Sequence, residues 1–145
     1  MTFEERLLLL DDVCAKLPYG LKVIHRNQVH DLLVVSQFGD IQVDSYEAWF
    51  DISTIRPFLR AIEDMTEDEI NEFSDLLTQA EDELPETPSK SLAIRATEGF
   101  SAFEKIMKWL NARHFDHQGL IQKGIAIKVT EENNPYNVSK EEDEN

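Results

Sequence analysis

The segment from Thr66 to Leu84 constrains the fold more than any other part of this 145-residue chain. Thr66 and Glu69 have the spacing of a capping box, in which a hydroxyl and a carboxylate satisfy two free N–H groups where a helix begins. Apolar residues then recur at intervals of three and four, which places them on one helix face. These residues are Ile70, Phe73, Leu77, Ala80 and Leu84, with Leu76 beside them. We therefore expect an amphipathic helix whose apolar face needs a partner.

The opposite face of this predicted helix is acidic, and we call the element the acidic helix. Eleven acids and no Lys or Arg lie between Glu63 and Glu86, whereas segment 100–129 holds two acids and five bases. A basic helix predicted over 101–113 is therefore the internal candidate to cover the acidic face, and an external basic protein is the alternative. Candidate partner-binding residues on the acidic face are Asp68, Glu72 and Asp75.

Composition predicts a folded, soluble protein. Hydrophobic residues make up 41% of the chain, enough to bury roughly two-thirds of the unfolded surface in one domain. The net charge of −15 disfavours nucleic acid and membrane surfaces as ligands, because both are bound through Lys and Arg. A single cysteine excludes an internal disulfide, and the apolar run Leu7–Leu10 is too short to span a bilayer. We expect a cytoplasmic location.

The N-terminal residues predict another capped helix. Thr2 and Glu5 have capping-box spacing, and Pro18 and Gly20 mark the end of the helix. The expected buried stripe is Phe3, Leu7, Leu10, Cys14 and Leu17, widened by Leu8 and Val13. Cys14 is then a small core residue rather than a nucleophile.

Between residues 20 and 56 the apolar period changes to two, which is typical of strands. Turn signals at 26–28 and 38–40 separate short strands in a small antiparallel meander, which could curl into an SH3-like barrel. The expected strands cover 21–26, 30–37, 41–46 and 49–52. The continuous apolar run Leu32–Val35 predicts burial on both faces, and Pro57 is expected to end the strand pattern.

The predicted fold class is therefore α+β: an N-terminal helix, the antiparallel meander, two helices and a short C-terminal strand. That strand, at Ile125–Val129, would cover the open edge of the meander. One domain is expected over 1–129, with a β-rich part at 20–56, a helical part at 66–122 and a proline-containing linker at 84–92. The acidic segment 130–145 is expected to be disordered.

Three sequence pieces together resemble a family of small uncharacterised proteins from gut anaerobic bacteria and their prophages. They are Cys14-Ala15-Lys16-Leu17-Pro18-Tyr19-Gly20, Ile55-Arg56-Pro57-Phe58-Leu59-Arg60 with Met65-Thr66-Glu67-Asp68-Glu69, and Trp109-Leu110-Asn111-Ala112-Arg113-His114-Phe115-Asp116 with Gly119-Leu120-Ile121 and Gly124-Ile125-Ala126-Ile127. Relatives tend to have Tyr-Arg where this chain has His117-Gln118. The resemblance implies a bacterial or phage origin, and no activity or cofactor.

Metal-binding side-chain types gather only at His114, Asp116 and His117. They lack the second ligand pair of zinc signatures, so a structural role is favoured, and no cofactor is expected. Glycine-rich phosphate loops and catalytic serine motifs are absent from the sequence. We therefore expect no enzymatic activity.

An aromatic and arginine patch is a further candidate for partner binding. Trp49, Arg56, Phe58 and Arg60 have the composition that dominates protein interfaces, although the same residues could simply cover the end of the meander.

Three functions are therefore open. The leading hypothesis is a non-enzymatic protein-interaction module that uses the acidic helix or the aromatic patch. The alternatives are an acidic DNA mimic that inhibits a nucleic-acid-binding protein, and a metal-dependent enzyme using His114, Asp116 and His117.

Overall fold

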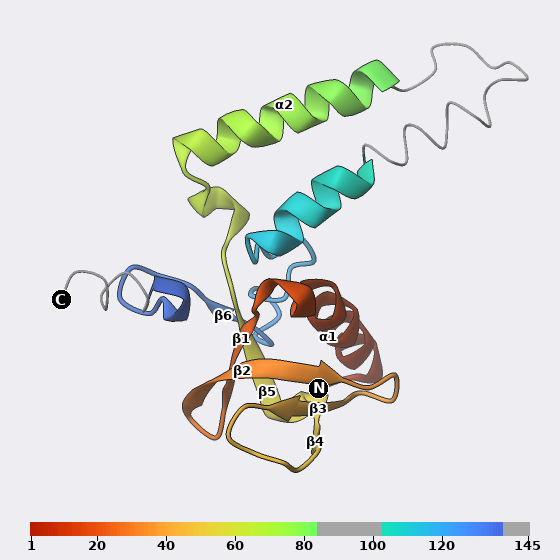
Figure 1. Ribbon diagram of the computed structural model, residues 1–145, viewed down its shortest axis with the longest axis vertical. Helices are drawn as coiled ribbons and strands as arrows, with labels where there is room; N and C mark the ends of the chain where they lie inside the picture. Colours follow the sequence, from red (N-terminus) through yellow and green to blue (C-terminus); the bar gives the residue numbers. More distant parts are fainter. Residues whose placement is uncertain (84–102, 138–145) are drawn as a thin grey trace, which may run out of the picture. The chain divides into compact units, whose positions relative to one another are not determined.

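The computed structural model describes residues 1–83 and 103–137, and it confirms the α+β fold class (Figure 1). The predicted linker at 84–92 lies outside the described residues. The chain divides into two compact units: unit 1 combines Met1–Ile62 with Asn111–Asn145, and unit 2 is Glu63–Leu110. In the described ranges, no helix combines the length and the apolar character needed to span a lipid bilayer.

Unit 1 begins with α1 (Phe3–Lys16), which has the predicted capping box. The Glu5 N–H donates to Thr2 Oγ1 at 3.1 Å, and the Thr2 N–H donates to Glu5 Oε1 at 3.0 Å. A 3₁₀ turn at Leu17–Tyr19 follows, and Gly20 ends it with φ +69°, a conformation that favours glycine. The N-terminal sequence signals are therefore confirmed.

The buried stripe of α1 differs from the predicted one. Leu9, Asp12, Val13 and Lys16 are buried, whereas Phe3, Leu7 and Cys14 are exposed. The predicted core position of Cys14 is therefore wrong. The reason is that two of the four buried residues are charged and pair with each other, so a search for apolar periodicity selects a neighbouring face.

Six strands form one sheet, in the order β4-β3-β2-β1-β5-β6. Their bounds are β1 Lys22–His25, β2 Gln28–Val35, β3 Asp40–Val43, β4 Phe50–Asp51, β5 Ile55–Leu59 and β6 Ile127–Lys128. The first five pair antiparallel, and a 3₁₀ turn at Ile52–Thr54 returns the chain from β4 to β5, which pairs with β1. A register shift between Leu32 and Val34 interrupts the pairing of β2 with β3, which is the kind of irregularity that lets a meander curl.

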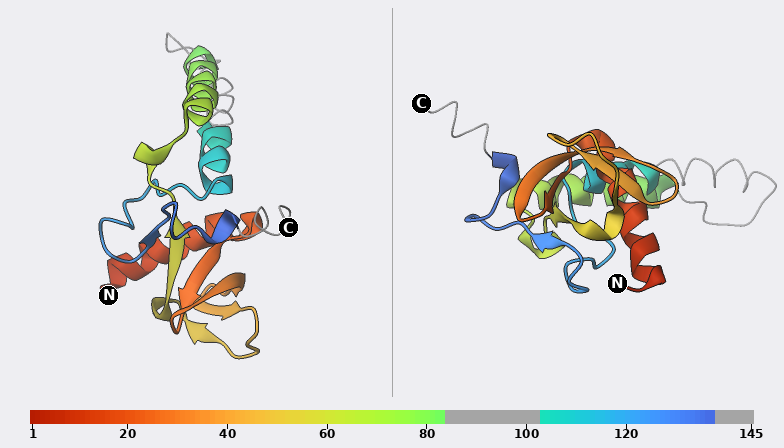
Figure 2. Two further views of the ribbon diagram at one scale, coloured as in Figure 1. Left: turned by 90° about the vertical axis from the view of Figure 1, so that its left-hand side faces the viewer. Right: turned by 90° about the horizontal axis from the view of Figure 1, so that it is seen from below.

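The hydrophobic core of unit 1 lies between α1 and the sheet. Leu9 and Val13 of α1 belong to one buried cluster with residues from β1, β2, β3, β5 and the loop before β6. Figure 2 shows α1 alongside the strands of this unit. The strand members of the cluster include Val23, Leu32 and Ile41.

Pro57 does not end the strand as predicted, because β5 runs through it and Pro57 lies opposite Val23 of β1. The Leu32 N–H donates to Leu21 O, so the alternation along β1 turns the polar groups of Val23 toward β2. Position 57 therefore needs no N–H for the ladder with β1, and a proline is tolerated there.

Strand β2 is not covered on both faces. Leu33 and Val34 are exposed, while Leu32 is buried. The run Leu32–Val35 is continuous because it contains both a buried side and an exposed apolar side. The predicted two-sided burial of this strand is wrong.

The C-terminal strand β6 pairs parallel to β5 and covers its edge, as expected, although it is shorter than predicted. The chain beyond it differs from the expected disorder up to residue 137. Pro135–Asn137 form a 3₁₀ turn, and the Tyr136 hydroxyl donates to Phe58 O at 2.8 Å and accepts from the Lys22 N–H at 3.1 Å. This hydroxyl bridges β1 and β5. Residues 138–145 lie outside the described ranges.

Unit 2 contains α2 (Glu67–Glu83), which is the acidic helix. Its predicted capping box is confirmed: the Glu69 N–H donates to Thr66 Oγ1 at 3.2 Å, and the Thr66 N–H donates to Glu69 Oε1 at 3.0 Å. A further helix covers residues 103–112, within the range predicted for the basic helix. The predicted capping residues 101–102 lie outside the described ranges.

Candidate functional site

The surface of α2 carries two separate stripes of exposed side chains. Asp68, Glu72 and Asp75 follow an i, i+4, i+7 spacing and are all exposed, so the three acidic candidates share one face. Ile70 and Leu77 lie two turns apart on another face and are 51% and 42% exposed. Half-exposed apolar side chains on a helix with this charge mark α2 as a candidate binding surface.

Trp109 contacts α2 through both a ring and a hydrogen bond. Its indole N–H donates to Glu72 Oε2 at 3.0 Å, and its ring lies 5.6 Å from that of Phe73. Lys108, one of the bases expected to cover the acidic helix, pairs instead with Glu104 of its own helix at 3.5 Å. A tryptophan therefore makes this contact, whereas charge counting pointed to lysines.

The predicted aromatic and arginine patch is not a single surface. Phe58 is buried in the core, so its role as a partner-binding residue is excluded in the folded unit. Arg60 lies over the ring of Phe115 at 4.3 Å. Trp49 and Arg56 are exposed, but they come from different elements, the loop before β4 and the strand β5. Arg56 and Phe58 are two residues apart and so lie on the same side of β5, which means that the neighbouring segments cause the difference in their exposure.

A buried polar cluster joins α1 to Asn111, at the end of the 103–112 helix, and to His117 beyond it. Lys16 Nζ donates to Asp12 Oδ1, one helical turn away, and to Asn111 Oδ1 at 3.1 Å. His117 Nε2 donates to the same Asn111 oxygen at 2.9 Å. Lys16 and Asp12 are completely buried, and Asp12 Oδ2 has no hydrogen-bond partner among the described residues.

Burial controls the electrostatics of this cluster. It raises the pKa of the Asp12 carboxyl and lowers the pKa of the Lys16 ammonium, because each charged form loses its hydration. Each charge offsets part of the cost of burying the other. Burial also lowers the pKa of His117, and the positive charge of Lys16 acts in the same direction.

Lysines with a lowered pKa can act as bases or nucleophiles when a substrate can reach them. Lys16 has no exposed surface, and both of its hydrogen bonds run to buried side chains. The cluster therefore holds α1 against the segment that begins at Asn111, and we assign it a structural role.

The three candidate metal ligands, His114, Asp116 and His117, each bind different partners within the protein. His114 Nε2 donates to Tyr19 O at 2.7 Å and stacks on Tyr136 at 4.1 Å, and burial lowers the pKa of His114. The Asp116 carboxylate accepts from the N–H groups of Leu120 and Ile121, both at 2.9 Å. His117 belongs to the buried cluster. Among the described residues, no group of three His, Cys, Asp or Glu side chains is arranged to hold a metal ion.

A cluster of buried histidines and aromatic side chains, which the sequence did not predict, lies beside the turn between β1 and β2. His25 and His30 are buried, with rings 6.2 Å apart, and His30 Nδ1 donates to Asp44 Oδ1 at 2.8 Å. The rings of Tyr46 and Phe50 complete the group. The alternation along β1 already placed His25 on the same side as Val23, and this was the signal that could have found it.

Comparison of the chain with protein-family models, curated proteins and solved structures finds no match.

Proposed function

We propose that this protein is a non-enzymatic interaction module that binds a basic, partly apolar segment of a partner protein along α2. The single observation that carries the proposal is the exposure of Ile70 and Leu77 on a helix without basic residues. No cofactor is part of the proposal.

The negative charge of α2 indicates that the partner segment is positively charged. All ionisable residues of Glu67–Glu83 are acids. Asp68 and Asp75 are exposed and have no ion-pair partner among the described residues. Seven residues of helix separate them by about 10 Å along the axis. Lys or Arg residues two turns apart on a helical partner would match this spacing.

The apolar stripe supports a protein rather than a DNA-mimic role. Glu67, Ile70, Ser74 and Leu77 follow an i, i+3, i+7, i+10 spacing, so they form one continuous line of exposed residues. A surface that only imitates phosphates needs no apolar side chains along its centre. The two apolar members of this line, Ile70 and Leu77, are seven residues apart, and apolar anchors with such helical spacing are the usual way in which one helix recognises another.

Designed peptides test the proposal whatever the identity of the natural partner. The probe is an 18-residue amphipathic peptide with leucines at i, i+3 and i+7 and lysines on its flanks. Two controls are a scrambled peptide of the same composition and a version with glutamates in place of the lysines. Fluorescence anisotropy measures binding of each labelled peptide to the full chain.

We expect the amphipathic basic peptide to bind at least about tenfold more tightly than either control. Ile70→Ser/Leu77→Ser should remove the preference over the scrambled peptide, and Asp68→Asn/Asp75→Asn should reduce the dependence of binding on salt. Equal binding of the basic and scrambled peptides to the natural chain would refute an apolar contact. Tighter binding of the acidic peptide would refute the assigned charge.

A further inference from the structure

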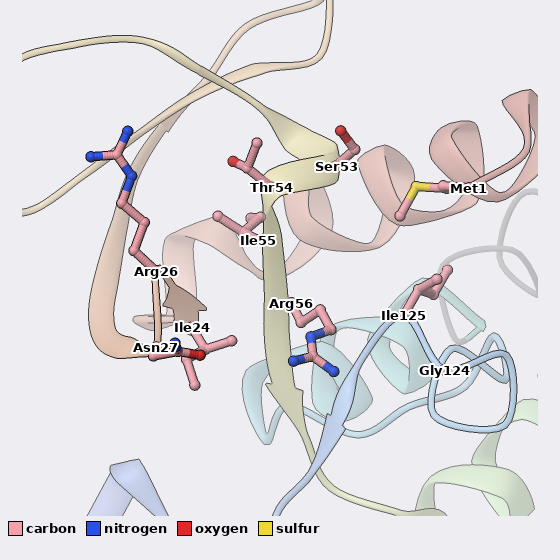
Figure 3. A pocket seen from close by; sticks show the side chains of 10 residues that line it. All are labelled: Met1, Ile24, Arg26, Asn27, Ser53, Thr54, Ile55, Arg56, Gly124 and Ile125. Atoms are coloured by element: carbon pink, nitrogen blue, oxygen red, sulfur yellow. The ribbon is translucent and has the colours of Figure 1, made fainter.

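Unit 1 contains a pocket of about 280 Å³ that belongs to none of the sites above. It opens where four separate segments meet: the N-terminal Met1, the end of β1 with the β1–β2 turn, the 3₁₀ turn with the start of β5, and the loop before β6 (Figure 3). The volume is at the lower limit for small-molecule sites, so it suits a compact ligand.

The wall of this pocket combines an apolar part with cationic and neutral polar groups. Ile24, Ile55 and Ile125 supply the apolar part, and Arg56 and Asn27 supply hydrogen-bond donors. None of the ten residues that line it is an acid, although the chain has 29 acids and 14 bases. The charge of the pocket wall is therefore opposite in sign to the net charge of the whole molecule, which favours an anionic ligand.

The side-chain donors that remain for a ligand are those of Arg56 and Asn27. Neither side chain has a hydrogen-bond or ion-pair partner among the described residues, and Figure 3 shows the Arg56 guanidinium projecting from β5 between Asn27 and Ile125. The hydroxyls of Ser53 and Thr54 already donate to Asp51, at 2.5 and 2.7 Å. These two hydroxyls therefore help to shape the wall without offering a free donor.

Arg26 contributes its stem to the wall, while its guanidinium is directed away from Arg56 in Figure 3. That guanidinium lies 5.1 Å from the centre of the Phe50 ring and 5.9 Å from that of Tyr46. One guanidinium, from Arg56, is thus available inside the pocket, and it can bind a carboxylate through two parallel hydrogen bonds.

We propose that this pocket binds a small carboxylate that carries a short branched apolar group. The carboxylate pairs with Arg56 and accepts from the Asn27 amide, while the apolar group packs against Ile24, Ile55 and Ile125. A phosphate dianion is disfavoured because one arginine would neutralise only part of its charge in a chain of net charge −15.

Two sources could supply this chemistry: a free branched-chain acid, or the C-terminal residue of a peptide. Two-dimensional NMR of the labelled full chain can compare them. The probes are 4-methylpentanoate, the tripeptide Gly-Gly-Leu, Gly-Gly-Leu amide, and 3-methylbutyl phosphate. The amide removes the negative charge and keeps the shape, and the phosphate keeps the apolar group while it changes the anion.

We expect saturable shifts of the Asn27, Thr54 and Ile125 amides with one of the two carboxylates, at a dissociation constant of about 1 mM or below. Arg56→Gln should weaken this binding at least about tenfold. The affinity of Arg56→Lys should lie between those of the natural chain and Arg56→Gln, because the charge remains and the paired hydrogen bonds are lost. Arg113→Gln is the matched control, since it removes an arginine that does not line the pocket.

The two carboxylate arms distinguish the sources, because a free acid fits without a preceding peptide and a C-terminus requires one. Equal binding of the amide or of the phosphate would overturn the proposal. So would the absence of saturable shifts at about 10 mM of every probe, or equal weakening by Arg113→Gln and Arg56→Gln. These results are independent of the peptide experiment on α2, so either proposal can fail alone.

Discussion

Replacement of Lys16 by methionine tests the buried cluster most directly. Methionine keeps most of the volume of the side chain and removes its charge. In Lys16→Met, the Asp12 carboxylate stays buried without its main cation, and its Oδ2 atom already has no partner among the described residues. His117 Nε2 lies 3.8 Å from Asp12 Oδ1, beyond hydrogen-bond distance, and already donates to Asn111.

The expected loss of stability follows from the complete burial of both Asp12 and Lys16. Removal of one partner of a buried ion pair typically costs about 3–5 kcal/mol. For a chain of this size each kcal/mol lowers Tm by roughly 2–4 °C, so we expect a decrease of about 6–20 °C. Asp12→Val/Lys16→Met should recover at least half of the lost free energy of unfolding, because no unpaired charge remains.

The chain provides a matched control for this change. Lys108 and Glu104 also form an i, i+4 pair, but their side chains are 65% and 66% exposed. Lys108→Met should therefore change the free energy of unfolding by no more than about 0.5 kcal/mol. Urea denaturation followed by circular dichroism measures all three variants. Equal effects of Lys16→Met and Lys108→Met would refute the burial of the Asp12–Lys16 pair.

Three further predictions follow from the described contacts. Tyr136→Phe should cost about 1–3 kcal/mol, because the Lys22 N–H and the Phe58 carbonyl both lose their partner; unchanged urea denaturation would contradict the bridge between β1 and β5. Burial lowers the pKa values of His114 and His117 below the ordinary histidine value. Their contribution to stability is therefore complete above about pH 6.5 and is lost as the pH falls. The urea midpoint should decrease between pH 7.5 and pH 5.5, and it should decrease less in His117→Gln. Cys14 should react with a maleimide in the folded protein, although more slowly than a free thiol because burial and Asp11 raise its pKa, and labelling that requires urea would restore the predicted core position.

Local signals predicted the elements of this fold well. The capping boxes at Thr2 and Thr66 form as expected, because each depends only on residues three positions apart. The turn at Arg26 and Asn27 also forms, with positive φ at both residues. The C-terminal strand covers an edge of the sheet as expected, although its partner is β5, a strand that the sequence pattern did not predict.

The errors came from residues whose role depends on distant partners. Asp12 and Lys16 are buried because each neutralises the other, and Asn111, 95 residues beyond Lys16, completes the arrangement. Apolar periodicity cannot register a charged pair of this kind. The predicted aromatic and arginine patch failed for a similar reason. Phe58 is buried and Arg56 lines the pocket, because different neighbouring segments surround these two residues although they are only two positions apart.

The pocket could not have been predicted from spacing alone. Its donors come from Asn27 in a turn and Arg56 in a strand, and Ile125 comes from a loop near the other end of the chain. Arg56 was nevertheless a binding candidate from composition, because arginine beside aromatic residues is common in interfaces. Its partners in the site became visible only when these separate segments were placed together.

The Tyr136 hydroxyl bridge also has a consequence for the order of events during biosynthesis. The strands that it joins have emerged from the ribosome long before residue 136 is made, so the contact at Lys22 must wait until residue 136 has been synthesised. The interval from Glu63 to Leu110 is continuous in sequence and has no such requirement. In pulse-labelled refolding of the full chain, the same contact joins residues 114 positions apart, so the Lys22 amide should gain protection from hydrogen exchange after those of β2 and β3, and simultaneous protection would contradict this order.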